Sequence, residues 1–207
     1  MKTTILATAL LCGASIAGAQ QQKEPPPRMA ASSFATVEVH VDARPIGREW
    51  YREDAGLTGP ARIAIRYGQP HARGRAVEGG LVPLDTVWRF GANEATTLHT
   101  DLDIKLGTLS LDRGDYALYL LYTRQGWDLI VNRRTGVWGT DRDAAKDLGR
   151  VRMTARAVSE PEDALSIYLI PNSERPQSGY ASLGGTLKIR WGRTELTTPF
   201  AVRGVTP

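Results

Sequence analysis

Residues 74–97 read GRAVEGGLVPLDTVWRFGANEATT and form the most distinctive stretch of the chain. Five glycine and proline residues interrupt regular structure within it: Gly74, Gly79, Gly80, Pro83 and Gly91. The same stretch carries Trp, Arg, Asn and Glu side chains, which can make directional polar contacts. We therefore predict an ordered loop, called the central loop below, because loops of this composition commonly carry function or fix a fold.

The sequence on both sides of the central loop alternates between apolar and polar residues, which is the pattern of strands with one buried face. This alternation is seen at residues 37–41, 61–67 and 98–104. Residues 116–123, YALYLLYT, are apolar at odd-numbered and even-numbered positions alike and predict a central strand that is covered on both faces. Gly107-Thr108 and Gln125-Gly126 have the composition of hairpin turns.

Three further alternating runs close the chain, at residues 151–155, 165–170 and 187–191, and the last continues through Gly192-Arg193. Residues 43–60 are rich in Gly, Pro and charge and are interpreted as a connection. One short helix is expected between Thr140 and Gly149. We predict an all-β fold: a single antiparallel β-sandwich or open barrel of about nine strands with one short helix.

The first residues have the layout of a secretory signal. Lys2 precedes an apolar run from Ile5 to Ile16, and Ala17-Gly18-Ala19 resembles a cleavage site. We expect a signal peptide at residues 1–19, a flexible Pro-rich tether at 20–32 and a single β-rich domain at 33–207. The expected location is the periplasm or the extracellular medium, with no transmembrane segment in the mature chain.

Cysteine and charge content narrow the function classes. The only cysteine, Cys12, lies in the expected signal peptide, so the mature chain would lack disulfides and thiolate nucleophiles. A net charge of +4 over 207 residues is too small to predict nucleic-acid binding. Because 42% of residues are hydrophobic and 23% are charged, neither disorder nor a membrane-embedded body is indicated.

Several motifs together resemble an uncharacterised bacterial family, the domain of unknown function number twenty-nine eleven. They are Tyr67-Gly68-Gln69-Pro70, Gly74-Arg75, Gly79-Gly80-Leu81-Val82-Pro83, Val87-Trp88-Arg89, the run from Gly91 to Thr97, Gly114-Asp115-Tyr116 and Trp127. The resemblance covers about residues 59–169. Leu84 and Phe90 depart from the residues that the family often has there. The resemblance implies an exported, mostly β protein and supplies no mechanism.

The candidate ligand-binding residues of the central loop are Arg75, Trp88, Arg89, Asn93 and Glu94. A guanidinium, an amide and a carboxylate around a turn could bind a sugar, a peptide terminus or an anion. The same groups could instead satisfy the backbone of the loop, which is the stronger interpretation because buried irregular segments require such partners. Trp88 is interpreted as a core anchor, with sugar stacking as the alternative.

Candidate metal ligands are His99, Asp101 and Asp103, which occupy alternate positions and would share one face of a strand. An exposed strand gives the same pattern, and no second His stands at ligand spacing. We therefore predict no metal and no cofactor.

No nucleophile elbow, zinc-protease helix, phosphate-binding loop or dinucleotide fingerprint is found in the sequence. We favour a non-catalytic exported module whose central loop stabilises the fold or binds a small polar ligand or an envelope component. The alternative is a hydrolase of envelope glycan or peptide, with Glu94 as acid or base and Arg89 and Asn93 orienting the substrate. A third hypothesis is an assembly subunit, although the sequence does not specify an oligomeric state.

Overall fold

The computed structural model of the protein describes residues 30–41, 43–46, 49–52, 61–172 and 183–203. The expected signal peptide and residues 20–29 of the expected tether lie outside the described residues. The strands are β1 (Ser33–Val41), β2 (Ala43–Ile46), β3 (Glu49–Arg52), β4 (Ala61–Gln69), β5 (Val87–Trp88), β6 (Thr96–Thr100), β7 (Ile104–Leu106), β8 (Leu109–Leu111), β9 (Gly114–Thr123), β10 (Gly126–Asn132), β11 (Asp147–Pro171) and β12 (Gly184–Val202).

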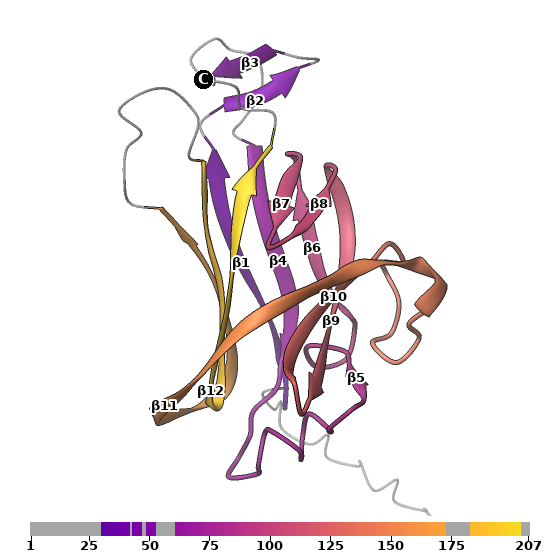
Figure 1. Ribbon diagram of the computed structural model, residues 1–207, viewed down its shortest axis with the longest axis vertical. Coiled ribbons are helices and arrows are strands. Elements are labelled where there is room, and N and C mark those ends of the chain that lie inside the picture. The colour runs from indigo at the N-terminus through magenta and orange to yellow at the C-terminus, as the bar shows by residue number, and fades with distance from the viewer. Residues whose placement is uncertain (1–29, 42, 47–48, 53–60, 173–182, 204–207) are drawn as a thin grey trace, which may run out of the picture.

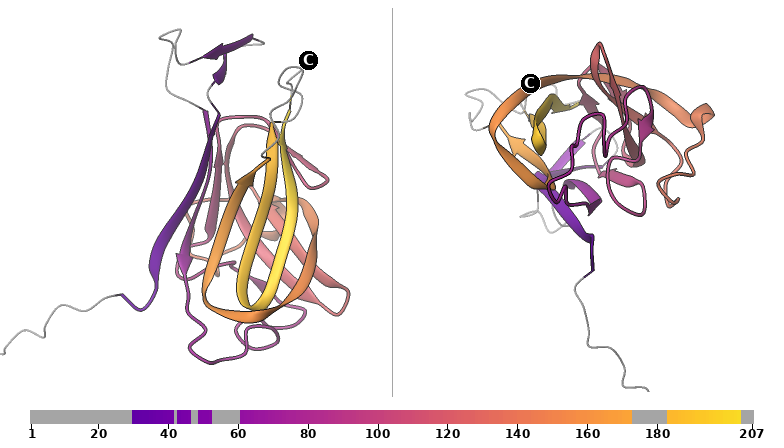
Figure 2. Two further views of the ribbon diagram at one scale, coloured as in Figure 1. Left: turned by 90° about the vertical axis from the view of Figure 1, so that its left-hand side faces the viewer. Right: turned by 90° about the horizontal axis from the view of Figure 1, so that it is seen from below.

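One open antiparallel sheet forms most of the molecule, which confirms the predicted all-β class (Figure 1). Its strand order is β1-β4-β6-β9-β10-β11-β12-β7-β8, with β5 paired to β9 beside this path. A separate two-stranded sheet joins β2 and β3. The main sheet curls around its core, as the view from below shows (Figure 2).

Strands β11 and β12 form two nested turns at one end of this sheet. β12 reverses its direction at Gly192-Arg193, so the parts of the strand before and after this turn lie side by side (Figure 2). At their far ends, the Val202 amide donates to the Leu183 carbonyl at 2.7 Å. β11 runs around the outside, and its residues Ala157 and Glu162 pair with Thr194 and Gly192. The four β11 residues between these two pairs form a wide bulge around the tighter turn of β12.

The main hydrophobic core lies inside the curl and includes residues from all the long strands. A smaller cluster lies on the opposite face of the sheet and includes Ala117, Tyr119 and Ile130. β9 contributes to both, because Leu118 and Leu120 point into the main core while Ala117 and Tyr119 point into the second cluster. This confirms the prediction that residues 116–123 form a strand covered on both faces.

The predicted strand at residues 98–104 is wrong beyond Thr100, where β6 ends. The Thr100 hydroxyl donates to the Leu102 carbonyl at 2.7 Å and accepts from the Leu102 amide at 3.1 Å. These two bonds close a local turn, which separates β6 from β7. The alternation of apolar residues continues across this break because Leu102 and Ile104 are both buried.

The predicted helix at residues 140–149 is reduced to a 3-10 turn at Ala144–Lys146, capped by the Asp143 carboxylate, which accepts from the Ala145 amide. The runs at 151–155 and 165–170 belong to one strand, β11, and not to two. The predicted connection at 43–60 is also partly wrong, since β2 and β3 pair antiparallel there, while residues 47–48 and 53–60 lie outside the described residues.

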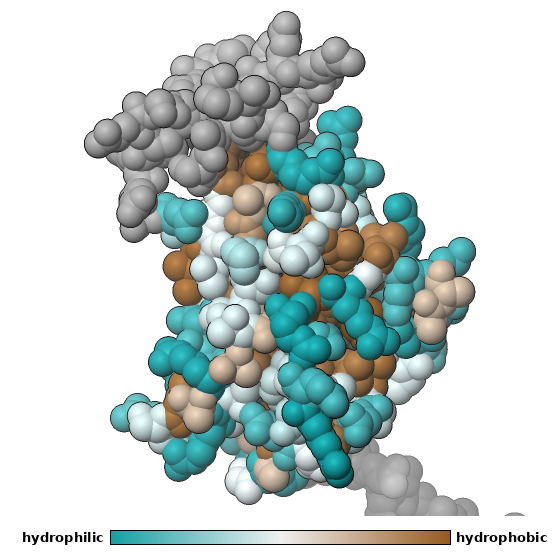
Figure 3. All heavy atoms as spheres, in the orientation of Figure 1, coloured by the Kyte–Doolittle hydropathy of each residue, from teal (hydrophilic) through white to brown (hydrophobic). Residues whose placement is uncertain are grey.

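Hydrophobic side chains on the face shown in Figure 3 occur in patches between hydrophilic ones. Five large hydrophobic side chains of the described residues are exposed: Phe34, Leu84, Trp138, Tyr168 and Ile170. Tyr168 and Ile170 both belong to β11, while Phe34 belongs to β1 and Leu84 and Trp138 lie outside the strands.

Candidate functional site

Trp88 in the central loop is a packing residue. Its ring stacks on the Trp191 ring with centroids 5.3 Å apart and an interplanar angle of 17°. The Trp191 indole N–H donates to the Asp163 carbonyl at 3.0 Å, which ties the turn of β12 to β11. This pair supports the interpretation of Trp88 as a core anchor.

Arg89, Asn93 and Glu94 contact the protein itself. The Arg89 Nε donates to the Gly91 carbonyl at 3.2 Å, and the main-chain carbonyl of Asn93 accepts from the Gly139 amide at 3.0 Å. Glu94 forms an ion pair with Arg66 at 3.0 Å, and half of each side chain is exposed. The Arg89 side chain thus satisfies the loop backbone and Glu94 pairs with β4, while a ligand-binding role for the loop residues stays a prediction.

His99 contacts two carboxylates, with its Nδ1 at 2.8 Å from Asp115 Oδ1 and its Nε2 at 3.4 Å from Asp101 Oδ1. Asp103 is engaged elsewhere, because its Oδ1 accepts from the Arg113 amide at 2.8 Å. Within the described parts of the chain, no group of three or more His, Cys, Asp or Glu side chains is arranged to hold a metal ion.

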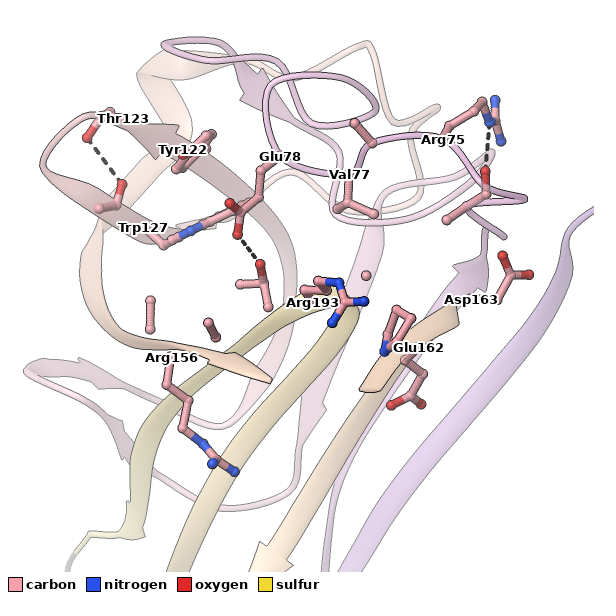
Figure 4. A pocket seen from close by; sticks show the side chains of 18 of the residues that line it. Arg75, Val77, Glu78, Tyr122, Thr123, Trp127, Arg156, Glu162, Asp163 and Arg193 are labelled. Carbon is pink, nitrogen blue, oxygen red and sulfur yellow. Dashed lines mark hydrogen bonds between the residues drawn. The ribbon is translucent and has the colours of Figure 1, made fainter. Parts of the chain in front are cut away.

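A large open cleft of about 980 Å³ lies at the end of the curled sheet where the β12 turn is found (Figure 4). Four segments far apart in the sequence line it: residues 72–78, the β9–β10 turn at 122–127, the β11 bulge region at 155–163 and the β12 turn at 192–194. This volume is typical of small-molecule sites, which span about 300–1,000 Å³. We call it the end cleft.

Aromatic and apolar side chains make one wall of the end cleft. The Tyr122 and Trp127 rings stack with centroids 4.5 Å apart and an interplanar angle of 23°. Val77 lies close to Gly192, where an added Cβ would come within 2.9 Å of Val77 Cγ2. Gly192 also has a φ of 57°, so both the turn and this close approach require glycine.

Three carboxylates line the end cleft, and each already accepts hydrogen bonds or forms an ion pair within the protein. Glu78 accepts from the Thr194 hydroxyl (Figure 4). Glu162 lies 3.3 Å from Arg190 and accepts from the Tyr168 hydroxyl at 3.2 Å.

Asp163 is the third of these carboxylates, and it accepts from the Arg73 amide at 2.6 Å and contacts His71 Nδ1 at 3.1 Å. The Arg73 amide, followed by the His71 hydrogen bond, lowers the pKa of the Asp163 carboxyl below its usual value. Asp163 therefore stays ionised and fixes the start of the loop at residues 71–73 on β11.

Four arginines also line the end cleft, and they differ in what they contact. The Arg75 guanidinium donates to the Ala72 and His71 carbonyls at 2.9 and 2.8 Å, so it holds its own loop. Arg156 pairs with Glu195 at 2.6 Å and extends away from Val77 and Glu78 (Figure 4).

The other two arginines stand on hairpin turns. Arg193 follows Gly192 in the β12 turn and projects into the cleft, with one nitrogen donating to the Ser159 carbonyl (Figure 4). Arg124 is exposed on the β9–β10 turn, and no side-chain hydrogen bond or ion pair joins it to another described residue. These two guanidinium groups retain most of their donors for a ligand.

Of the five ligand-binding residues predicted from the sequence, Arg75 alone lines the end cleft. Sequence reasoning missed Arg124, Arg193 and the Tyr122–Trp127 pair. Arg193 follows Gly192 and Arg124 stands two residues before Gly126, and a glycine in a short turn is an ordinary hairpin signal. Their assembly into one cleft depends on pairing between strands that are distant in the sequence. The hydrophobic periodicity of the sequence does not indicate which strands pair.

The fold and the cleft define an all-β protein whose curled sheet carries, at one end, a cleft lined by both charged and apolar side chains. The chain belongs to the family described as "Protein of unknown function (DUF2911)", whose model matches residues 53–200. This confirms the family resemblance found in the sequence motifs. No curated protein and no solved structure matches the chain. The described parts of the chain contain no helix that is both long and apolar enough to cross a membrane.

Proposed function

We propose that the protein is an exported, non-catalytic binding module that takes a small polar ligand in the end cleft. One observation carries this proposal: four segments that are distant in the sequence line an open cleft of about 980 Å³, which combines arginines with an aromatic wall. Polar groups orient a ligand in such sites and apolar surface supplies much of the affinity. Export is supported by the signal-like composition of residues 1–19.

The non-catalytic part of the proposal is supported by how the cleft carboxylates are used. Glu78, Glu162 and Asp163 each contact donors from the protein. A general acid or base instead usually has an environment that brings its pKa near the working pH. Glu94, the acid or base of the alternative hydrolase, does not line the end cleft and is paired with Arg66.

A thermal-shift screen of the full chain against sugars, anions, peptides and divalent metals tests this proposal. Ala157 is exposed and lines the cleft, so the side chain of Ala157→Trp should obstruct ligand binding without disturbing the core. Ala144 is exposed on the 3-10 turn outside the cleft, so Ala144→Trp is the matched control.

We expect at least one polar compound to raise the melting temperature of the wild type and of Ala144→Trp, and not that of Ala157→Trp. The compound recovered after incubation should be chemically unchanged. Equal stabilisation of all three proteins would place binding outside the cleft, and a cleaved product would support the hydrolase instead.

A further inference from the structure

The balance of hydrogen-bond donors and acceptors in the end cleft indicates what kind of ligand it takes. The cleft has four arginines against three carboxylates. All three carboxylates accept hydrogen bonds from other groups of the protein, and the bonds to Asp163 come from a backbone amide and a histidine. A cationic ligand would therefore have to compete with donors already in place.

The arginines are not matched in the same way. Arg75 and Arg156 are committed to backbone carbonyls and to Glu195. Arg193 uses one nitrogen for the Ser159 carbonyl, which leaves most of its five N–H groups available. Arg124 adds a second guanidinium from a different hairpin turn on the rim of the same cleft. The cleft thus has an excess of charged donors.

We infer that the ligand of the end cleft is an anion, with a carboxylate or phosphate group bound by Arg193 and Arg124. This inference rests on the proposed function and specifies the class of ligand. Planar guanidinium groups bind both of these oxyanions through paired, charge-assisted hydrogen bonds.

The remainder of the ligand would lie along the aromatic wall. Tyr122 is half-buried and stacks on Trp127, and this stack stands at the base of the turn that carries Arg124. A sugar ring presents one apolar face and a rim of hydroxyl groups, which suits a cleft with an aromatic side and polar side chains opposite. An acidic or phosphorylated sugar combines both features.

Calorimetric titration of the full chain with glucose, glucuronate and glucose 6-phosphate, at matched low ionic strength, tests this inference. The two anions share the glucose ring, so a difference from glucose reports the charged group alone. We expect both anions, or one of them, to bind at least about tenfold more tightly than glucose. The comparison between the two anions distinguishes a carboxylate site from a phosphate site.

Arg193→Gln and Arg124→Gln should each weaken binding of the preferred anion about tenfold and leave glucose binding unchanged. Arg150 is an exposed arginine of β11 outside the cleft, so Arg150→Gln is the control and should bind like the wild type. Unchanged circular dichroism and melting temperature of the variants would show that they are folded.

Two results would overturn the inference in different ways. If glucose binds as tightly as the anions and Ala157→Trp abolishes its binding, the cleft is a ligand site without anion preference, and only this inference fails. If Arg193→Gln and Arg124→Gln both bind the preferred anion as tightly as the wild type does, the anion inference also fails while the proposed function stands. If none of the three sugars binds the wild type although another compound of the thermal-shift screen does, only this inference fails. If no compound of either experiment binds, the proposed function fails as well.

Discussion

Gly68 determines how closely the central loop approaches β4. Its carbonyl accepts from the Ala92 amide at 2.9 Å, and a Cβ added at Gly68 would lie 2.0 Å from the Ala92 carbonyl oxygen. Because both partners are backbone atoms, neither can move without displacing the loop. The glycine of the Tyr67-Gly68-Gln69-Pro70 motif is therefore required by packing and not by turn conformation.

We predict that Gly68→Ala lowers the free energy of unfolding by about 3 kcal/mol or more, because the added methyl group overlaps the loop backbone. Chemical denaturation measures this change. Gly136→Ala is the control, since Gly136 has a φ of 66° but no atom within 4 Å of an added Cβ. That variant should lose only about 1–2 kcal/mol through backbone strain. Equal losses in the two variants would contradict the role of close packing at Gly68.

Single residues also show where sequence reasoning succeeds. Interpreting Trp88 as a core anchor agrees with its stack on Trp191, because a large aromatic ring between glycine-rich segments has few other places to lie. The grouping of Arg124 with Arg193 was not predictable in this way. These residues are 69 positions apart, and nothing in the local sequence of either indicates the other.

At the scale of elements, the nested turns of β11 and β12 are held together by a cross-strand ion pair. Arg156 and Glu195 are direct partners in the register, and their side chains are 2.6 Å apart. The hydrogen bond from Arg156 lowers the pKa of the buried Glu195 carboxyl. A carboxyl whose pKa is lower in the folded state stabilises the fold above its unfolded pKa of about 4.3, and this contribution is lost as the pH falls through the folded value.

We therefore expect Glu195→Gln to be less stable than the wild type at pH 7, by an amount that stays constant down to about pH 5 and shrinks below about pH 4.3. Denaturation at a series of pH values measures the difference. Glu160→Gln, an exposed β11 carboxyl, is the comparison and should follow the wild type throughout. A stability difference between Glu195→Gln and wild type that does not change with pH would contradict the contribution of the ionised pair.

Elements also show which parts of the fold the sequence predicts. A run that is apolar at odd and even positions predicted β9, and the turn composition of Gln125-Gly126 predicted the hairpin of β9 and β10. Two-residue alternation predicted β1 and β4, since their apolar side chains face the core. It failed at β11, where Pro161 and the surrounding charges resemble a break between two strands. In the structure these residues form the wide bulge around the β12 turn, so pairing with β12 maintains one strand across them.

At the scale of the whole molecule, the main core unites strands from both ends of the chain. Ile63 of β4, Leu118 of β9 and Ile189 of β12 belong to the same buried cluster. Removing any one of these strands would expose the apolar side chains of the others to water, so the strands depend on one another for burial.

We predict that the domain unfolds in a single cooperative transition, as expected for one shared core. Tryptophan fluorescence and far-ultraviolet circular dichroism should give the same denaturation midpoint. Separate midpoints would show that the nested turns of β11 and β12 unfold independently of the rest.

Hydrogen–deuterium exchange of the full chain, with and without whichever of glucuronate and glucose 6-phosphate binds more tightly, tests the central claim most directly. This claim is that the end cleft is the ligand site. We predict slower exchange at residues 72–78, 122–127, 155–163 and 192–194, and unchanged exchange at residues 89–97 of the central loop. No change in exchange, or protection confined to residues 89–97, would contradict the claim.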